Sequence, residues 1–305
     1  MKRQLVRTIS AAPLLLLVTG LLQGVAMPHA GAVFPGKNGP IVFASDRTGF
    51  YDIYTIEPTG KGLHRVTSDP ALQLAPVWTQ NRSTIVFEQC CVNGSFDIYR
   101  MNANGSGIHR LTRSKTNDID PSVSKKGKIA FSRGTGGNYE IYTMDLNGHH
   151  LHRVTHSPAQ DLEPAWNPAG TRIAFQSTRT GTGDIYVMSA NGHDVKRLTI
   201  NPEVDKEPAW SPSGKKVVYA SLRGSSSKLH VVPVKAAGNG RKLTHGGGAD
   251  IDPSWSPDGK RIVFSSRRGK SPGFSLYTIG AQGGSLHKVI GAGRTADVKP
   301  DWGKR

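Results

Sequence analysis

The sequence has 305 residues with 36 Gly, 19 Pro and only 5 Met, and 36% of its residues are hydrophobic. This composition suits many short strands joined by tight turns better than a helical fold, and the length admits one large domain or two ordinary ones. The formal net charge of +17 is informative about binding partners and solubility rather than about the fold. A charge of this size can attract nucleic acid, acidic polysaccharide or anionic lipid.

The first 32 residues have the pattern of a cleaved export signal. A basic start is followed by an apolar run over 13–22 and by Ala30-Gly31-Ala32, which fits the A-x-A cleavage pattern. Pro13 and Gly20 keep the run below the roughly 20 residues of a membrane-spanning helix. We therefore predict a signal peptide over 1–32, a mature protein over 33–305 that starts at Val33, and a secreted or periplasmic location without a transmembrane segment.

Beyond the signal, the chain is built from a repeat of about 44 residues. Its marker is the tripeptide Pro-x-Trp, and all five Trp of the sequence fall at this position. Successive copies begin 43 to 47 residues apart: Pro76-Val77-Trp78, the degenerate Pro121-Ser122-Val123, Pro164-Ala165-Trp166, Pro208-Ala209-Trp210, Pro253-Ser254-Trp255 and Pro300-Asp301-Trp302.

Each repeat is predicted to form four short strands. The first carries Pro-x-Trp, and the second is an apolar run such as Ile41-Val42-Phe43. The third resembles Asp52-Ile53-Tyr54, and the fourth ends in a pattern such as Arg65-Val66-Thr67. Asn-Gly, the strongest short hairpin signal, precedes the fourth strand in three units. A lone four-stranded sheet cannot bury both faces, so such units stack radially as blades.

The two ends of the chain predict how the ring closes. Strands two to four occur six times, beginning at Ile41, Ile85, Ile129, Ile173, Val217 and Ile262. The first copy has no Pro-x-Trp strand before it, and the last Pro-x-Trp, at 300–302, has no strands after it. We therefore predict an all-β, six-bladed β-propeller of four-stranded blades, in which the C-terminal strand joins the N-terminal blade.

The repeat resembles a known family. Residues 207–216 read Glu-Pro-Ala-Trp-Ser-Pro-Ser-Gly-Lys-Lys, and residues 252–261 read Asp-Pro-Ser-Trp-Ser-Pro-Asp-Gly-Lys-Arg. With the Asp-Ile-Tyr and Arg-Leu-Thr strands, these units are similar to the WD40-like PD40 repeats of the TolB propeller family over residues 36–302. The resemblance implies a TolB-like propeller, without the N-terminal α/β domain of TolB, and a binding or scaffold role in the cell envelope.

A basic pair marks the fourth strand of every blade. The pairs are His64-Arg65, His109-Arg110, His152-Arg153, Lys196-Arg197, Arg241-Lys242 and His287-Lys288. Because this strand is the outer edge of its blade, the charges are expected chiefly to prevent edge-to-edge aggregation. The alternative is a basic girdle that binds an acidic cell-surface polymer. Nucleic acid is not an expected partner, because no aromatic residues are interleaved with the basic ones.

Acidic residues gather in the loops that lead into four of the first strands, in the pattern Asp-x-Asp/Glu-Pro. The eight carboxylates are Asp118, Asp120, Asp161, Glu163, Asp205, Glu207, Asp250 and Asp252. The loops between second and third strands open on the same face and carry Arg47, Arg133, Arg179, Arg223 and Arg267. Arg and carboxylate are expected to pair from blade to blade, since residues encoded by a repeat usually serve the repeat. Alternatively, the carboxylates converge on the channel mouth and bind a cation such as Ca²⁺, which takes oxygen ligands.

Cys90 and Cys91 interrupt the repeat in the second unit. In an oxidising compartment two adjacent free thiols do not persist, so a disulfide between the two is predicted. A bridge to another molecule or a soft-metal site is the alternative.

One catalytic-looking match, the Gly-x-Ser-x-Gly at 269–273, is interpreted as accidental because it falls in a loop between two propeller strands rather than at a strand-to-helix turn. No His-Glu-x-x-His or paired Cys-x-x-Cys pattern occurs. We therefore predict a monomeric, non-catalytic propeller without a cofactor, which binds an envelope protein or an acidic cell-surface polymer through its loop face. The alternative function is a propeller hydrolase or lyase with a cation at the channel mouth.

Overall fold

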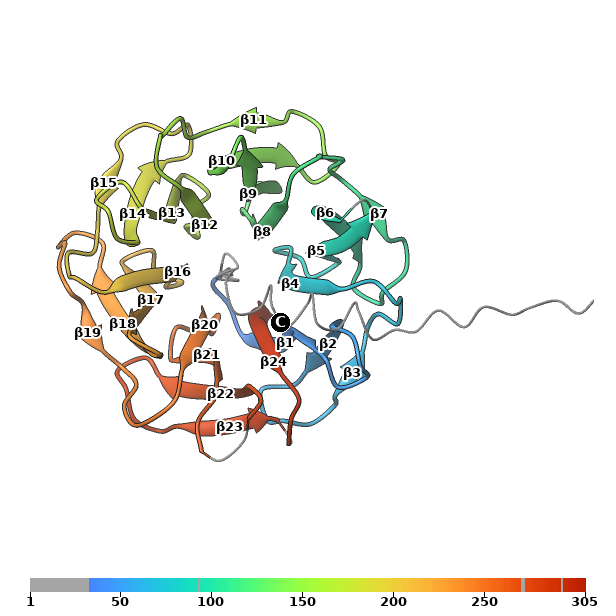
Figure 1. The fold of residues 1–305 in the computed structure, drawn as a ribbon. Coiled ribbons are helices and arrows are strands. Elements are labelled where there is room, and N and C mark those ends of the chain that lie inside the picture. Colours follow the sequence, from blue (N-terminus) through green and yellow to red (C-terminus); the bar gives the residue numbers. More distant parts are fainter. Residues whose placement is uncertain (1–32, 93, 270–271, 292) are drawn as a thin grey trace, which may run out of the picture.

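The structure is a computed structural model that describes residues 33–305 except 93, 270, 271 and 292. The predicted signal peptide, residues 1–32, lies outside the described residues. The strands form six four-stranded sheets arranged as blades around a central axis (Figure 1). The all-β, six-bladed propeller is thereby confirmed, and within the described part of the chain no helix is long and apolar enough to cross a membrane.

Each blade runs from a strand at the axis to a strand at the rim. The first blade contains β24 (Asp297–Lys304), β1 (Asn38–Ser45), β2 (Asp52–Ile56) and β3 (His64–Arg65). The second contains β4 (Gln73–Trp78), β5 (Thr84–Val92), β6 (Ser95–Asn102) and β7 (His109–Arg110), and the third β8 (Asp118–Val123), β9 (Lys128–Thr135), β10 (Asn138–Asp145) and β11 (His152–Arg153).

The remaining three blades repeat this order. The fourth blade contains β12 (Asp161–Trp166), β13 (Arg172–Ser177), β14 (Asp184–Ser189) and β15 (Lys196–Arg197). The fifth contains β16 (Val204–Trp210), β17 (Lys216–Arg223), β18 (Ser226–Pro233) and β19 (Arg241–Lys242), and the sixth β20 (Asp250–Trp255), β21 (Arg261–Ser266), β22 (Ser275–Gly280) and β23 (His287–Ile290).

Ring closure occurs where it is predicted. β24 is hydrogen-bonded to β1 in antiparallel register, with Ile41 opposite Trp302 and Ser45 opposite Asp297. β1 continues to β2 and β2 to β3, so the first blade combines both ends of the chain. Without β24 the first blade would lack its inner strand, and the edge of β1 would be open for pairing with another chain.

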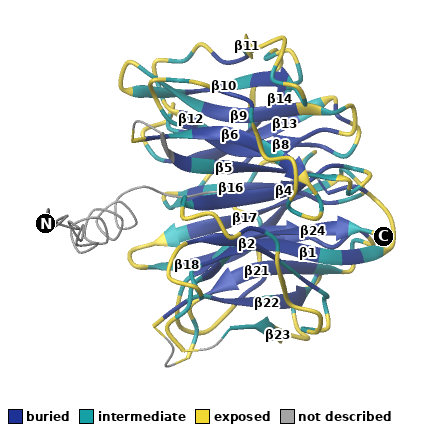
Figure 2. Ribbon diagram, turned by 90° about the vertical axis from the view of Figure 1, so that its right-hand side faces the viewer, coloured by how far each residue is buried: buried dark blue, intermediate teal, exposed yellow. Residues whose placement is uncertain are grey.

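The core lies between the blades. Apolar second strands are buried throughout, whereas the loops at both ends of the disc are exposed (Figure 2). In five blades a Phe of the second strand lies 5.8–6.1 Å, between ring centroids, from a Tyr of the third strand. Val33 and Phe34, the first described residues, are also buried against this core.

The disc has two unlike faces. We call loop face the one formed by the connections between β1 and β2, between β3 and β4, and their equivalents in the other blades. We call turn face the opposite one, formed by the turns between first and second strands and between third and fourth strands. β24 runs from the loop face to the turn face, so the C-terminus marks the turn face in Figure 2.

Candidate functional site

The inner strand of every blade has the same backbone irregularity, just before its proline. The residue there has a positive φ in all six blades, between 49° and 61°: Ala75, Asp120, Glu163, Glu207, Asp252 and Lys299. At this point the register with the second strand shifts, as in a β-bulge. Non-glycine residues with this backbone cost of order 1–3 kcal/mol each, so surrounding contacts must hold them in place.

Hydrogen bonds from one blade to the next hold these bulges. The backbone N–H of the bulge residue donates to a side chain of the preceding blade at five junctions. These bonds run from Asp120 to Glu88 (2.8 Å), Glu163 to Ser132 (3.0 Å), Glu207 to Glu163, Asp252 to Glu207 (2.7 Å) and Lys299 to Asp252 (3.3 Å). We call this series of contacts the carboxylate ladder. At the sixth junction, Asp301 of β24 accepts a bond from the Trp78 N–H of β4 (2.9 Å).

Burial dominates the electrostatics of the ladder. Burial, and next the neighbouring Glu207, raise the pKa of Glu163 to about 8, and the same two causes raise the pKa of Asp252 to about 7. Burial and the Glu88 carboxylate raise the pKa of Asp120 well above its usual range. Folding therefore favours the protonated form of these acids, which reduces the charge repulsion along the ladder.

Two lysines supply positive charge to the ladder. Lys206 Nζ lies 2.9 Å from Glu207 Oε1, and Lys299 Nζ lies 4.0 Å from Asp120 Oδ1. Burial alone lowers the pKa of Lys206, but Glu207 and then Glu163 raise it above its ordinary value. Lys299 occupies a bulge position itself and is only 2% exposed. The role of these two lysines was not predicted from the sequence, because the Asp-x-Asp/Glu-Pro pattern considers only the acids.

We call outer carboxylate the first acid of the Asp-x-Asp/Glu-Pro pattern, and the equivalent Asp297 of β24. Most outer carboxylates are bound by an arginine of the same blade, and not of the neighbouring blade as expected. Each is fully buried, and the arginine comes from the end of the neighbouring second strand. The pairs are Arg133 with Asp118 (2.6 Å), Arg179 with Asp161 (3.0 Å), Arg268 with Asp250 (2.6 Å) and Arg47 with Asp297. The same guanidinium groups lie over the Phe and Tyr rings of their blades, a favourable cation–π arrangement.

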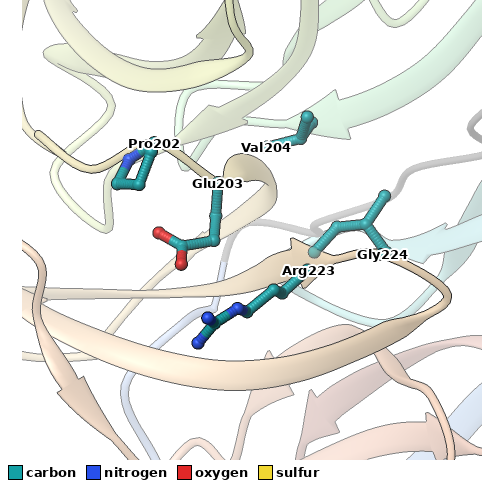
Figure 3. A pocket seen from close by; sticks show the side chains of 6 residues that line it. Pro202, Glu203, Val204, Arg223 and Gly224 are labelled. Carbon is teal, nitrogen blue, oxygen red and sulfur yellow. The ribbon is translucent and has the colours of Figure 1, made fainter.

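Two arginines named from the sequence do not form such pairs. In the sixth blade Arg268, not Arg267, binds the buried carboxylate, and Arg267 lies over the Phe274 ring instead. In the fifth blade Asp205 accepts a bond from Asn201 (2.6 Å), and burial raises its pKa to about 6. Arg223 and Glu203 instead line a cavity of about 470 Å³ on the loop face (Figure 3).

Part of the positive charge of the fourth-strand basic pairs is neutralised by ion pairs inside the blades. In four blades the arginine of the pair binds the acid that begins the third strand: Arg65 with Asp52, Arg110 with Asp97, Arg153 with Glu140 and Arg197 with Asp184. The Thr two residues after it accepts a bond from the next backbone N–H of the third strand. The acid of Asp-Ile-Tyr and the Arg-x-Thr pattern are therefore one structural unit.

No group of three or more His, Cys, Asp or Glu among the described residues could hold a metal ion. The four outer carboxylates of the Asp-x-Asp/Glu-Pro pattern do not converge, since each is bound within its own blade. Cys90 is disulfide-bonded; the side chain of Cys91, the only other cysteine of the sequence, lies outside the described part, so the pairing of these two cysteines stays a prediction.

The fold and this ladder define the class of protein, a six-bladed β-propeller whose repeat-encoded acids hold neighbouring blades together. The family model PD40, the TolB beta propeller domain, matches residues 127–223 and 201–305. Together these matches take in more than half of the chain, and the chain belongs to this family.

Solved structures agree with the family. TolB from Acinetobacter baumannii is 25% identical with a TM-score of 0.76, over 89% of this chain and 68% of that one. A putative TolB from Agrobacterium tumefaciens (20% identity, TM-score 0.66; 83% and 88% covered) and the hydrazine synthase of Kuenenia stuttgartiensis (19%, 0.73; 88% and 47%) share the fold. Comparison with curated proteins gives no match.

Proposed function

We propose that the chain is an exported, non-catalytic binding propeller of the cell envelope that holds a protein or polymer on its loop face. The family supports a TolB-like role, and the N-terminal sequence supports export. The protein is proposed to act extracytoplasmically, as a monomer and without a cofactor.

The observation that carries this proposal is the internal use of the repeat carboxylates. All eight are buried, with the inner four at the blade junctions and the outer four bound within their blades. Buried groups committed to such contacts are not open to a substrate. The loop face contains the cavity beside Arg223 in the fifth blade, and it exposes Ile200 (52%) in the loop that leads into this blade and Phe50 (47%) in the first blade. Exposed apolar side chains and a cavity on one face are typical of binding surfaces.

The alternative, a propeller hydrolase or lyase with Ca²⁺ at the channel mouth, has less support. It requires Asp118, Asp161, Asp205 and Asp250 to present free oxygen atoms to one ion. Three of these carboxylates are bound by arginine and the fourth by Asn201.

The test is quantitative capture of cross-linked envelope components by the protein over residues 33–305. A loop-face variant, Phe50→Asp with Arg223→Glu, should lose the captured component. A turn-face variant, Lys125→Gln with Lys126→Gln, should retain an envelope protein held on the loop face. Equal capture by the loop-face variant and the unchanged protein would contradict the proposal.

A further inference from the structure

The turns of the turn face nearest the channel are rich in positive charge. It includes the five turns between first and second strands, at 79–84, 124–128, 167–172, 211–216 and 256–261. In the first blade, the chain ends at 35–38 and 303–305 take the place of this turn. These segments contain twelve Lys and Arg but a single acidic residue, Asp258. Because all six blades contribute, the charges surround the channel at one end of the disc.

Most of these charges have no side-chain partner among the described residues; the exceptions are Arg261, which donates to Thr278 and to the Ser285 carbonyl, and Arg305, which lies 3.8 Å from Glu57. Lys125, Lys126 and Lys128 are exposed, as are Lys215 and Lys260. Among the lysines of the described residues, only Lys206, Lys228 and Lys299 form ion pairs, and none of the three lies in these turns. Four of the five fourth-strand arginines, by contrast, are bound to third-strand acids, and the fifth, Arg241, donates to Ala281 and Gln282. The basic girdle expected at the rim is therefore partly neutralised, and the available charge lies on the turn face.

The turn face is also hollowed. A cavity of about 390 Å³ lies between the turns of the second and third blades and the C-terminal strand, with Lys125 and Lys304 in its lining. The rest of its lining combines polar residues, such as Thr79, Asn81 and Ser124, with the apolar Val123 and Leu146. A concave site with convergent cations and polar groups suits a ligand that carries negative charge and hydrogen-bonding groups.

The shape of the charge favours a long ligand. Cations spread over six turns bind weakly one at a time, but a linear polymer contacts several of them at once. A lipid bilayer is the competing ligand that the test must exclude: the cation-bearing inner turns contain no large exposed hydrophobic residue, but Leu63, Ile108, Leu151, Val195 and Leu286 lie further out on the same face, in the turns between third and fourth strands. Peripheral membrane binding usually combines basic residues with apolar side chains that enter the bilayer.

We propose that the turn face binds a linear polyanion, a polymer with a carboxylate or phosphate on each repeating unit. The cavity beside Lys125 and Lys304 holds one stretch of the polymer, and the lysines of the neighbouring turns bind its continuation. This surface is distinct from the loop face of the proposed function, so one protein has a site for a polymer and another for a second partner.

The test measures binding of the 33–305 protein to alginate, a linear polyuronate, and to long-chain polyphosphate. The turn-face variant Lys125→Gln/Lys126→Gln is compared with the loop-face variant Arg113→Gln/Lys115→Gln. Both remove two exposed charges, at opposite ends of β8, and melting curves verify that both variants fold. The turn-face variant should raise Kd roughly fivefold and flatten its dependence on salt, whereas the loop-face variant should leave both unchanged.

Comparing the two polymers shows whether the turn face binds carboxylate or phosphate groups. Binding of alginate alone assigns a carboxylate polymer, and binding of polyphosphate alone assigns a phosphate polymer. The proposal is overturned if neither polymer binds or if the two variants weaken binding equally. It is also overturned if anionic lipid vesicles or duplex DNA bind more tightly than both polymers. Loss of the proposed loop-face function would appear instead in the capture experiment, in the Phe50/Arg223 variant.

Discussion

Asp301 provides a direct test of how the ring is joined to its closing strand. It lies on β24 and is 2% exposed. Its Oδ2 accepts a hydrogen bond from the Trp78 N–H of the second blade (2.9 Å), and its Oδ1 accepts one from the Ser254 hydroxyl of the sixth blade (3.3 Å). One side chain thus connects three blades. Replacing it by Asn keeps an acceptor but removes the charge, whereas replacing it by Ala removes both.

The size of the effect follows from the pKa. Burial raises the pKa of Asp301 from 3.8 to about 7, against smaller lowering by its hydrogen bonds. A raised carboxyl pKa favours the folded state fully below the unfolded pKa of about 4, and this contribution is lost as pH rises through about 7. A difference of about three units corresponds to at most about 4 kcal/mol of unfolding free energy. At about pH 5 the Ala variant should lose about 1–3 kcal/mol, because the buried Trp78 N–H has no acceptor.

The assay is denaturant unfolding of the unchanged protein and both variants between about pH 5 and pH 9. We expect the Asn variant to gain about 2–3 kcal/mol in unfolding free energy on the unchanged protein between about pH 5 and pH 9, because roughly 1.5 kcal/mol of the total of about 4 kcal/mol is already lost at about pH 5. The difference between the two proteins isolates Asp301 from the other buried acids. Parallel pH profiles for both proteins would refute this account of Asp301.

Three further predictions concern the other contacts. Arg133→Gln leaves the fully buried Asp118 without its partner and should cost about 3 kcal/mol at neutral pH, whereas Arg223→Gln should change stability by less than about 0.5 kcal/mol; equal losses in denaturant unfolding would contradict the pairing. Lys299→Met should destabilise the protein by roughly 1–3 kcal/mol, and more at alkaline than at acid pH, because the ladder acids lose a cation that favours ionisation; a uniform loss would argue against this charge effect. Alkylation without reductant should leave the intact mass unchanged if Cys90 is bridged as predicted, and two labels per chain would exclude the bridge.

The repeat predicted the fold because one spacing recurs along the whole chain. Pro-x-Trp, Asp-Ile-Tyr and Arg-x-Thr each mark a fixed place in a blade, so six imperfect copies support one another. The missing first strand before Ile41 and the unaccompanied strand at 300–302 were enough to predict the closure that β24 and β1 form. The PD40 resemblance, drawn from the same motifs, agrees with the family match.

The site was only partly predictable from the sequence. Arg133 and Asp118 can be recognised as complementary, but whether they meet within or between blades depends on the register of β8 and β9. Arg267 and Arg268 are neighbours in the sequence, and the conformation of their loop determines that Arg268 is the one that binds the buried Asp250. The ladder itself rests on a positive φ before proline, which the sequence does not reveal because none of these positions is a glycine: four are acids, and the other two are Ala75 and Lys299.

The inner repeat carboxylates join neighbouring blades and the outer ones stabilise single blades, which leaves function to the two faces of the disc. The most direct test compares the melting temperature of the metal-free protein in a chelator with that in excess Ca²⁺. We expect the two melting temperatures to agree, because the carboxylates are already bound by backbone N–H groups, arginines and lysines. A saturable rise with Ca²⁺, abolished by Asp161→Asn or Asp250→Asn, would contradict the account and favour a cation site at the channel mouth.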